Sequence, residues 1–185
     1  GPPAAAAEGT SPSVTFTIHV GSGGEKPVLP DTTELVSTWK ASIQKYYGGS
    51  EPSWTYGMEW NIIALERAGI DMGVDKEAYL ASVKEELADE YGDLTADGKP
   101  TDLERTALAM YALGLDPRNI EMEDGSTVDL IQWILDSERI SEGTNEAAYA
   151  LLAVDANAVN IPEGSRWNRD TLMEELLSFQ ADDGS

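Results

Sequence analysis

The sequence predicts an all-α protein built from repeated helical hairpins. From residue 31 onward, apolar residues recur at intervals of three and four positions, which is the period of a helix with one buried face. Segments rich in alanine and leucine also return at intervals of 41 to 45 residues, and two of them end in glycine. A helical period combined with an internal repeat is typical of an array of helical hairpins.

A different pattern precedes residue 31. Residues 14–20 alternate between apolar and polar side chains, so we expect a short, half-buried β-strand there. Alanine, proline and glycine dominate the rest of this part, and proline and glycine interrupt regular structure. We therefore divide the chain into an N-terminal segment with one strand, residues 1–30, and a hairpin-repeat domain, residues 31–185.

Seven helices are predicted in the repeat domain. Several begin at a capping residue such as Asp75 or Asn168, and several end at a glycine. The predicted helices lie between Asp31 and Gly48 and over residues 58–68, 75–87, 101–113, 127–135, 145–154 and 168–179. Helices of this length with short connections are typical of antiparallel neighbours.

The predicted helices alternate between two types. One type is rich in alanine and apolar on most sides, as in Asn61–Ile70, Thr106–Leu115 and Ala147–Ala156. Gly69 matches Gly114 at a shift of 45 residues, and Ala112–Leu113 matches Ala153–Val154 at a shift of 41. The other type carries a single apolar stripe. We therefore expect an inner row of small-residue helices and an outer row that faces water.

The end of the domain carries a distinctive motif. Leu176 and Leu177 are followed by Gln180, Asp183 and Gly184, a spacing that resembles the Gln-Trp repeat of squalene–hopene cyclases and other terpene cyclases. The resemblance implies the α/α toroid fold of the prenyltransferase and terpene-cyclase superfamily, and a bacterial surface protein is the member that we favour. In that family the glutamine and the Asp-Gly turn join a helix end to the next hairpin.

Two consequences follow from this resemblance. Gln180, Asp183 and Gly184 are expected to have a structural role, since aspartate favours turns and glycine tolerates positive φ. The chain also supplies fewer hairpins than a closed toroid needs. We therefore expect either an open, partial α/α toroid or a part of a longer polypeptide.

The catalytic motifs of the superfamily do not carry over. Class II terpene cyclases use an Asp-x-Asp-Asp motif, which Ala181-Asp182-Asp183-Gly184 does not fit. Protein prenyltransferases bind zinc partly through cysteine, whereas this chain has no cysteine and a single histidine. The acidic segments 93–102 and 121–129 lack the spacing of a calcium-binding loop. We therefore predict no catalytic residue, no cofactor and no metal site.

The charge of the chain is strongly negative. Its 34 acidic and 12 basic residues give a formal net charge of −22, which disfavours binding to nucleic acids and to anionic membrane surfaces. No apolar run reaches the roughly 20 residues that span a bilayer. The Ala/Pro/Ser-rich start is typical of the spacer behind a cleaved signal or lipid anchor. We therefore expect an extracellular or cell-surface location in a bacterium.

Two kinds of side chain are candidates for ligand binding. Aromatic rings in loops or at helix starts can stack on sugars or prenyl chains. Carboxylates near the start of the inner helices can bind a cation or act as an acid–base pair on a glycan, although capping of the helix is their simpler explanation. The candidates are Trp54, Tyr56, Trp60 and Trp167 among the aromatic residues, and Glu59, Glu104 and Glu146 among the carboxylates.

These observations favour a non-catalytic extracellular binding module whose ligand is a protein, a glycan or a small molecule. The first alternative is a toroid enzyme that acts on a glycan or an isoprenoid through Glu59, Glu104 or Glu146. The second is a carrier of cobalamin or another small molecule, because the resemblance extends to carriers of the intrinsic-factor type.

Overall fold

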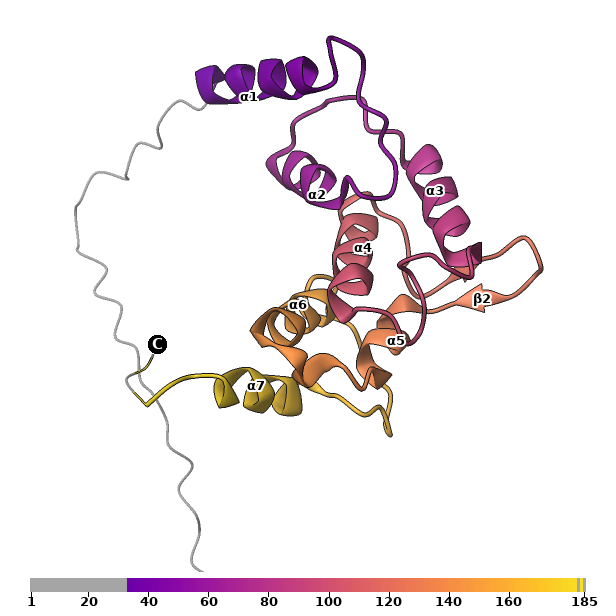
Figure 1. Cartoon of the computed structure of the whole chain (residues 1–185), viewed down its shortest axis with the longest axis vertical. Coiled ribbons are helices and arrows are strands. Elements are labelled where there is room, and N and C mark those ends of the chain that lie inside the picture. Colours follow the sequence, from indigo (N-terminus) through magenta and orange to yellow (C-terminus); the bar gives the residue numbers. More distant parts are fainter. Residues whose placement is uncertain (1–32, 183, 185) are drawn as a thin grey trace, which may run out of the picture. The chain divides into compact units, whose positions relative to one another are not determined.

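The computed structural model describes residues 33–182 and 184. Within them lie seven α-helices, one short 3-10 helix and one two-stranded sheet (Figure 1). The predicted all-α class is therefore confirmed. The predicted strand over residues 14–20 lies outside the described residues, as does Asp183.

Each α-helix overlaps one of the predicted helices. The helices are α1 (Thr33–Tyr46), α2 (Glu59–Ala68), α3 (Lys76–Ala88), α4 (Pro100–Ala112), α5 (Leu130–Asp136), α6 (Thr144–Asp155) and α7 (Arg169–Ser178). The strands are β1 (Ile120–Glu121) and β2 (Thr127–Val128), and the 3-10 helix η1 is Ile140–Glu142. The contacts divide the chain inside α1, between Trp39 and Lys40, so α2 to α7 belong to one unit.

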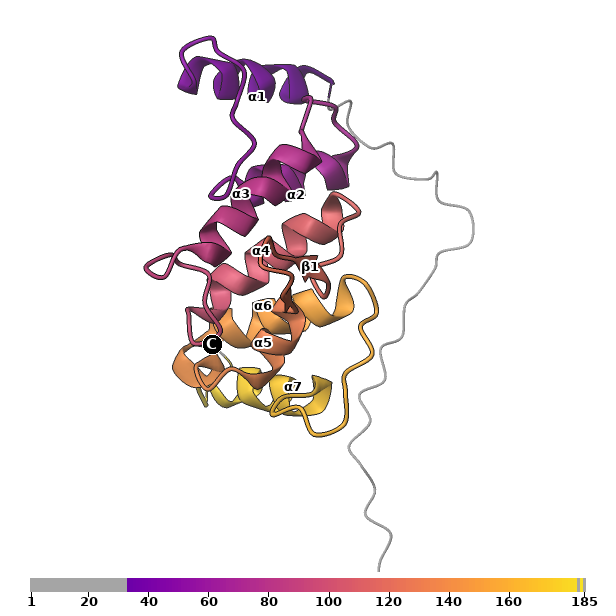
Figure 2. The same ribbon diagram turned by 90° about the vertical axis from the view of Figure 1, so that its right-hand side faces the viewer.

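Helix α4 is the central element of this unit. It packs against α2, α5 and α6, and α6 also packs against α7 (Figures 1 and 2). Helices α2, α4 and α6 are the three small-residue helices, and they follow one another in space in that order. Small side chains allow close packing of helices. The fully buried alanines of this row are Ala107, Ala109, Ala147, Ala150 and Ala153.

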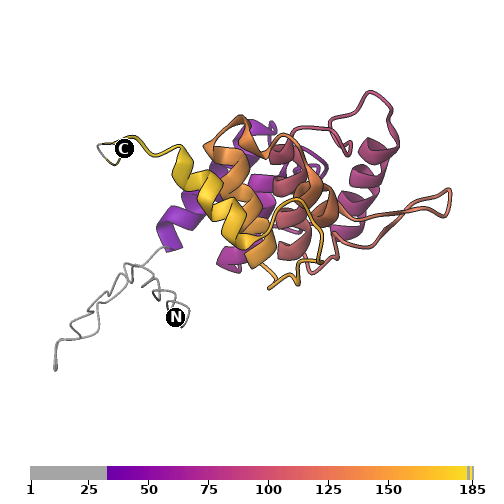
Figure 3. The ribbon, with the colours of Figure 1, turned by 90° about the horizontal axis from the view of Figure 1, so that it is seen from below.

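A second layer covers one side of the row formed by α2, α4 and α6. It contains α3, α5 and the β hairpin, and the hairpin projects beyond the helices on the side of α3 (Figures 1 and 3). Helix α5 buries four large apolar side chains, and α3 buries Tyr79 and Val83. Both helices therefore turn one apolar stripe towards the first layer, as amphipathic helices do.

The β hairpin corrects the predicted start of the fifth helix at Thr127. That residue belongs to β2, which pairs antiparallel with β1. Helix α5 begins only after Asp129, because the Asp129 carboxylate accepts a hydrogen bond from the Gln132 amide at 2.9 Å and caps the helix. Gly125, with φ of 82°, allows the tight turn between the strands.

The three small-residue helices end in the same hydrogen-bonded motif. In each, an amide donates to the carbonyl five residues earlier, a bond that belongs to the Schellman motif. These bonds are Ile70 to Leu65 at 2.9 Å, Leu115 to Met110 at 2.8 Å and Val159 to Val154 at 2.8 Å. The residue before each donor has a left-handed backbone, with φ of 66° at Gly69, 73° at Gly114 and 46° at Ala158.

This motif sets the register of the repeat. Gly114 lies 45 residues after Gly69, and Ala158 lies 44 residues after Gly114. The shift of 41 residues inferred from the alanine pattern is therefore wrong for the third copy. The glycine signal disappears there because an alanine occupies the left-handed position.

Replacing Ala158 by glycine is expected to stabilise the protein by about 0.5–1 kcal/mol. The left-handed backbone costs alanine roughly 1–2 kcal/mol, and the larger entropy loss of glycine on folding offsets part of that cost. Urea unfolding measures the difference. Gly114→Ala is the matched reverse change, since a Cβ there meets nothing within 4 Å and adds only backbone strain. A loss of stability in Ala158→Gly would contradict the assigned backbone.

The C-terminal turn joins Gln180 to Gly184. The Gln180 Nε2 donates to the Gly184 carbonyl oxygen at 2.9 Å, and the Gly184 amide donates to the Ala181 carbonyl at 2.8 Å. Gly184 has φ of 85°, a conformation that glycine adopts readily. These two bonds close a local turn after α7, and the role of the motif as a joint to a further hairpin stays a prediction.

Candidate functional site

The predicted carboxylates lie near the N-terminal ends of α2, α4 and α6. Glu59, the first residue of α2, is 1% exposed. Its Oε1 accepts hydrogen bonds from the Gly57 amide at 2.8 Å and the Tyr79 hydroxyl at 3.2 Å. Its Oε2 pairs with the Arg105 Nε at 3.2 Å. Glu59 therefore connects α2, α3 and α4 and has a structural role.

Tyr56 takes part in the same connection. Arg105 pairs with Asp102, donates from Nη2 to the Tyr56 hydroxyl at 2.9 Å, and lies 5.5 Å from the centre of the Tyr56 ring. The Tyr56 amide donates to the Ser82 Oγ at 2.8 Å. Burial raises the pKa of the Tyr56 phenol above its usual range, so this hydroxyl stays protonated. Both the hydroxyl and the ring of Tyr56 are thus in contact with Arg105.

Glu104 is fully buried and has a different environment. Neither of its carboxyl oxygens has a hydrogen-bond partner among the described residues. Burial, followed by the charges of Glu146 and Asp102, raises the pKa of Glu104 to about 9. The Glu104 carboxyl is therefore neutral at physiological pH. No part of it is exposed to a substrate in solution.

Glu146 lies in the first turn of α6 and is partly buried. Its carboxylate approaches Gly143, the residue that precedes the helix, so closely that a Cβ at Gly143 would lie 2.8 Å from Oε2. A carboxylate at a helix start is stabilised by the helix dipole. The charge of Glu146 acts on the buried carboxyl of Glu104, whereas Glu59 is paired with Arg105.

The four predicted aromatic residues differ in exposure. Trp54 is 6% exposed, so little of its ring is available to a ligand. Trp167 is partly buried, and its Nε1 donates to the Ser137 carbonyl at 2.8 Å. Trp60 is 49% exposed and meets the Tyr149 ring edge-to-face at 5.4 Å between centres. Trp60 therefore keeps the most open ring of the predicted tryptophans.

Two findings concern metals and membranes. In residues 33–182 and 184, no group of three or more histidine, aspartate or glutamate side chains is placed to hold a metal ion. None of the helices in this part of the chain is long and apolar enough to cross a membrane.

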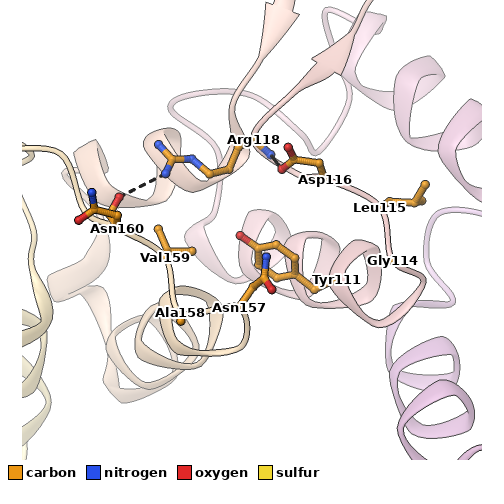
Figure 4. A pocket seen from close by; sticks show the side chains of 9 residues that line it. All are labelled: Tyr111, Gly114, Leu115, Asp116, Arg118, Asn157, Ala158, Val159 and Asn160. Atoms are coloured by element: carbon orange, nitrogen blue, oxygen red, sulfur yellow. Dashed lines mark hydrogen bonds between the residues drawn. The ribbon is translucent and has the colours of Figure 1, made fainter.

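A pocket lies at the opposite ends of α4 and α6, where both helices terminate. Its volume is about 510 Å³, within the range of small-molecule sites. Figure 4 shows its lining on two facing loops, with Tyr111 of α4 between them. The lining residues are Tyr111, Gly114, Leu115, Asp116, Arg118, Asn157, Ala158, Val159 and Asn160. Glu104 lies seven residues before Tyr111, about 10 Å along the helix axis.

Arg118 joins the two loops of this pocket. Its Nε pairs with the Asp129 Oδ2 at 3.1 Å, and its Nη1 donates to the Asn160 carbonyl at 3.3 Å (Figure 4). The Arg118 amide donates to the Asp116 Oδ1 at 2.9 Å and closes the turn after α4. Burial, followed by the charge of Asp116, raises the pKa of the Tyr111 phenol to about 12. The Tyr111 hydroxyl therefore keeps its proton at neutral pH.

None of the pocket residues was predicted as a binding residue. A signal does exist in the sequence: Asp116–Asn119 and Asn157–Asn160 are short polar loops that each follow a small-residue helix. The Schellman motif places the two loops at equivalent positions of the repeat. A repeat register of 44 residues aligns Asp116 with Asn160 and so predicts that the two loops are neighbours.

Comparison with known proteins identified no relative. No family model matches the chain, and no curated protein or solved structure matches it. Assignment to the terpene-cyclase-like repeat family therefore stays a prediction from the C-terminal motif.

Proposed function

We propose that this chain is a non-catalytic binding module of the bacterial cell surface, and that it binds its ligand in the pocket between the ends of α4 and α6. The observation that carries the proposal is the pocket itself, whose hydrogen-bonding groups come from two loops joined by Arg118. A site of this size with a few converging polar groups is the usual form of a small-molecule site. The extracellular location rests on the Ala/Pro/Ser-rich N-terminal segment, whose composition is typical of the spacer behind a cleaved signal or lipid anchor.

The distribution of carboxylates supports binding over catalysis. Glycoside hydrolysis generally requires two carboxyl groups on either side of the scissile bond. Asp116 is the one carboxylate among the residues that line the pocket. At the other end of the row, Glu59 has three hydrogen-bonding partners and Glu104 is fully buried. Of the three predicted carboxylates only Glu146 is partly exposed, so no two of them form an accessible acid–base pair.

A ligand screen by thermal unfolding tests the proposed function. The probes are a panel of saccharides, amino acids, nucleosides, organic acids and polyamines, each at millimolar concentration. A bound probe is expected to raise the melting temperature by mass action and to be recovered unchanged by mass spectrometry. Asn160→Trp, which places a large ring at the pocket, should abolish the shift without lowering the melting temperature of the free protein.

Two outcomes would contradict this function. One is the absence of any shift across the panel. The other is conversion of a probe into a product that disappears in the Asn160→Trp variant, because that result would indicate an enzyme. Asn145→Ala, which changes an exposed asparagine at the opposite end of α6, serves as the control and should leave the shift intact.

A further inference from the structure

We infer that the pocket between the ends of α4 and α6 binds a neutral saccharide. This inference rests on the proposed function and specifies its ligand class. Three properties of the pocket carry it: the charge around the site, the mixture of hydrogen-bond donors and acceptors, and the tyrosine ring in the lining.

The charge around the pocket disfavours an anionic ligand. Arg118 is the one cation among the lining residues, and it is already paired with Asp129. Asp116 adds a second negative charge at the rim. The pocket also lies at the C-terminal ends of two helices, where the carbonyl dipoles favour donors and cations over anions. A phosphate or carboxylate would meet no unpaired positive charge there.

The charge does not favour a strongly cationic ligand either. Arg118 and Asp129 balance each other's charge, so Asp116 is the one uncompensated charge among the lining residues. A cationic ligand would have to pair with the Asp116 carboxylate, which already accepts a hydrogen bond from the Arg118 amide. Divalent cations are also disfavoured, because no cluster of three acidic or histidine ligands occurs among the described residues. The charges therefore disfavour anions and divalent cations, and one carboxylate that already accepts a hydrogen bond gives only weak selection for an organic cation.

The polar groups suit a ligand rich in hydroxyls. Asn157 and Asn160 each offer an amide donor and a carbonyl acceptor, and the protonated Tyr111 hydroxyl offers both. A guanidinium has five N–H donors, of which the bonds to Asp129 and the Asn160 carbonyl occupy two. A sugar hydroxyl donates and accepts at once, so adjacent hydroxyls can match such a set.

The Tyr111 ring completes the match. It belongs to the last turn of α4 and lies between the two loops (Figure 4). An aromatic ring presents an apolar face beside a polar edge, and the C–H face of a pyranose can pack on it. The volume of about 510 Å³ accommodates a mono- or disaccharide. The geometry therefore provides both the stacking surface and the hydroxyl partners that sugar recognition uses.

Saturation-transfer NMR with defined saccharides tests the inference. The neutral probes are methyl glycosides of glucose, galactose, mannose and N-acetylglucosamine, with cellobiose and lactose. Glucuronate and glucosamine are the anionic and cationic comparators. We expect at least one neutral probe to bind, with both charged comparators weaker by tenfold or more. Asn157→Ala and Tyr111→Phe should each weaken Kd about fivefold through loss of one hydrogen bond.

Each other outcome counts against the inference. Neutral binding that survives both Asn157→Ala and Tyr111→Phe overturns it, because the sugar would then bind elsewhere. Binding of amino acids or nucleosides without any neutral saccharide overturns the ligand class and leaves the proposed binding function intact. Absence of binding by every class of probe overturns both. Asn145→Ala is again the matched control and should leave Kd unchanged.

Discussion

Glu104→Gln is expected to remove a pH-dependent loss of stability of about 4 kcal/mol between pH 5 and pH 8. The pKa of Glu104 in the folded protein is about 9, above the usual value of 4.5, because the carboxyl is buried beside Glu146 and Asp102. Between these two pH values the unfolded chain releases the proton while the folded chain keeps it. The contribution of Glu104 to stability is therefore fully present below pH 4.5 and is lost as the pH rises towards 9. A glutamine has no proton to release.

Urea unfolding of both proteins at pH 5, 6, 7 and 8 measures this effect. The wild-type stability should decline relative to that of the variant at each step, whatever constant cost the buried amide adds. Glu174→Gln, an exposed change on α7, should follow the wild-type curve. Glu146→Gln should reduce the slope only in part, since burial is the larger cause of the raised pKa. Parallel curves for wild type and Glu104→Gln would refute the assignment.

Glu59→Ala is expected to destabilise the protein by about 2–4 kcal/mol. Removing one partner of a buried ion pair typically costs 3–5 kcal/mol, and the lower range applies because the Arg105 side chain is 23% exposed and can reach water. The substitution also leaves the buried Tyr79 hydroxyl without its carboxylate acceptor. Three helices meet at this residue, so the loss should appear in global unfolding.

Two variants separate the charge of Glu59 from its hydrogen bonds. Glu59→Gln keeps an acceptor for the Gly57 amide and the Tyr79 hydroxyl, so it should cost less than Glu59→Ala. Glu66→Ala, an exposed change on the same helix, should alter stability by less than about 0.5 kcal/mol. Equal stabilities of Glu59→Ala and Glu66→Ala would show that Glu59 does not join the helices.

The local parts of the fold follow from short-range rules. The caps at Asp75 and Asn168 are confirmed: Asp75 accepts the Glu77 and Ala78 amides, and Asn168 forms a reciprocal capping box with Thr171. These bonds depend on residues two or three positions apart, which the sequence displays directly. The Schellman ends at Gly69 and Gly114 are equally local. The third helix end has no such signal in the sequence, because Ala158 takes the left-handed position that glycine normally occupies.

The candidate site depends on distances that no local pattern contains. Trp54 and Glu104 are buried, whereas other tryptophan and glutamate side chains of the chain are exposed. Residue type alone therefore does not predict their burial, which results from the elements packed over them. Tyr111 and Asn157 are 46 positions apart, and they line one pocket only because α4 and α6 lie side by side. The helical period of the apolar residues predicted the seven helices along the chain, since this period depends on residues within two turns of one another. The packing of whole helices against one another decides the rest. It determines which helix faces are in contact, which carboxyl group is buried and where a pocket remains.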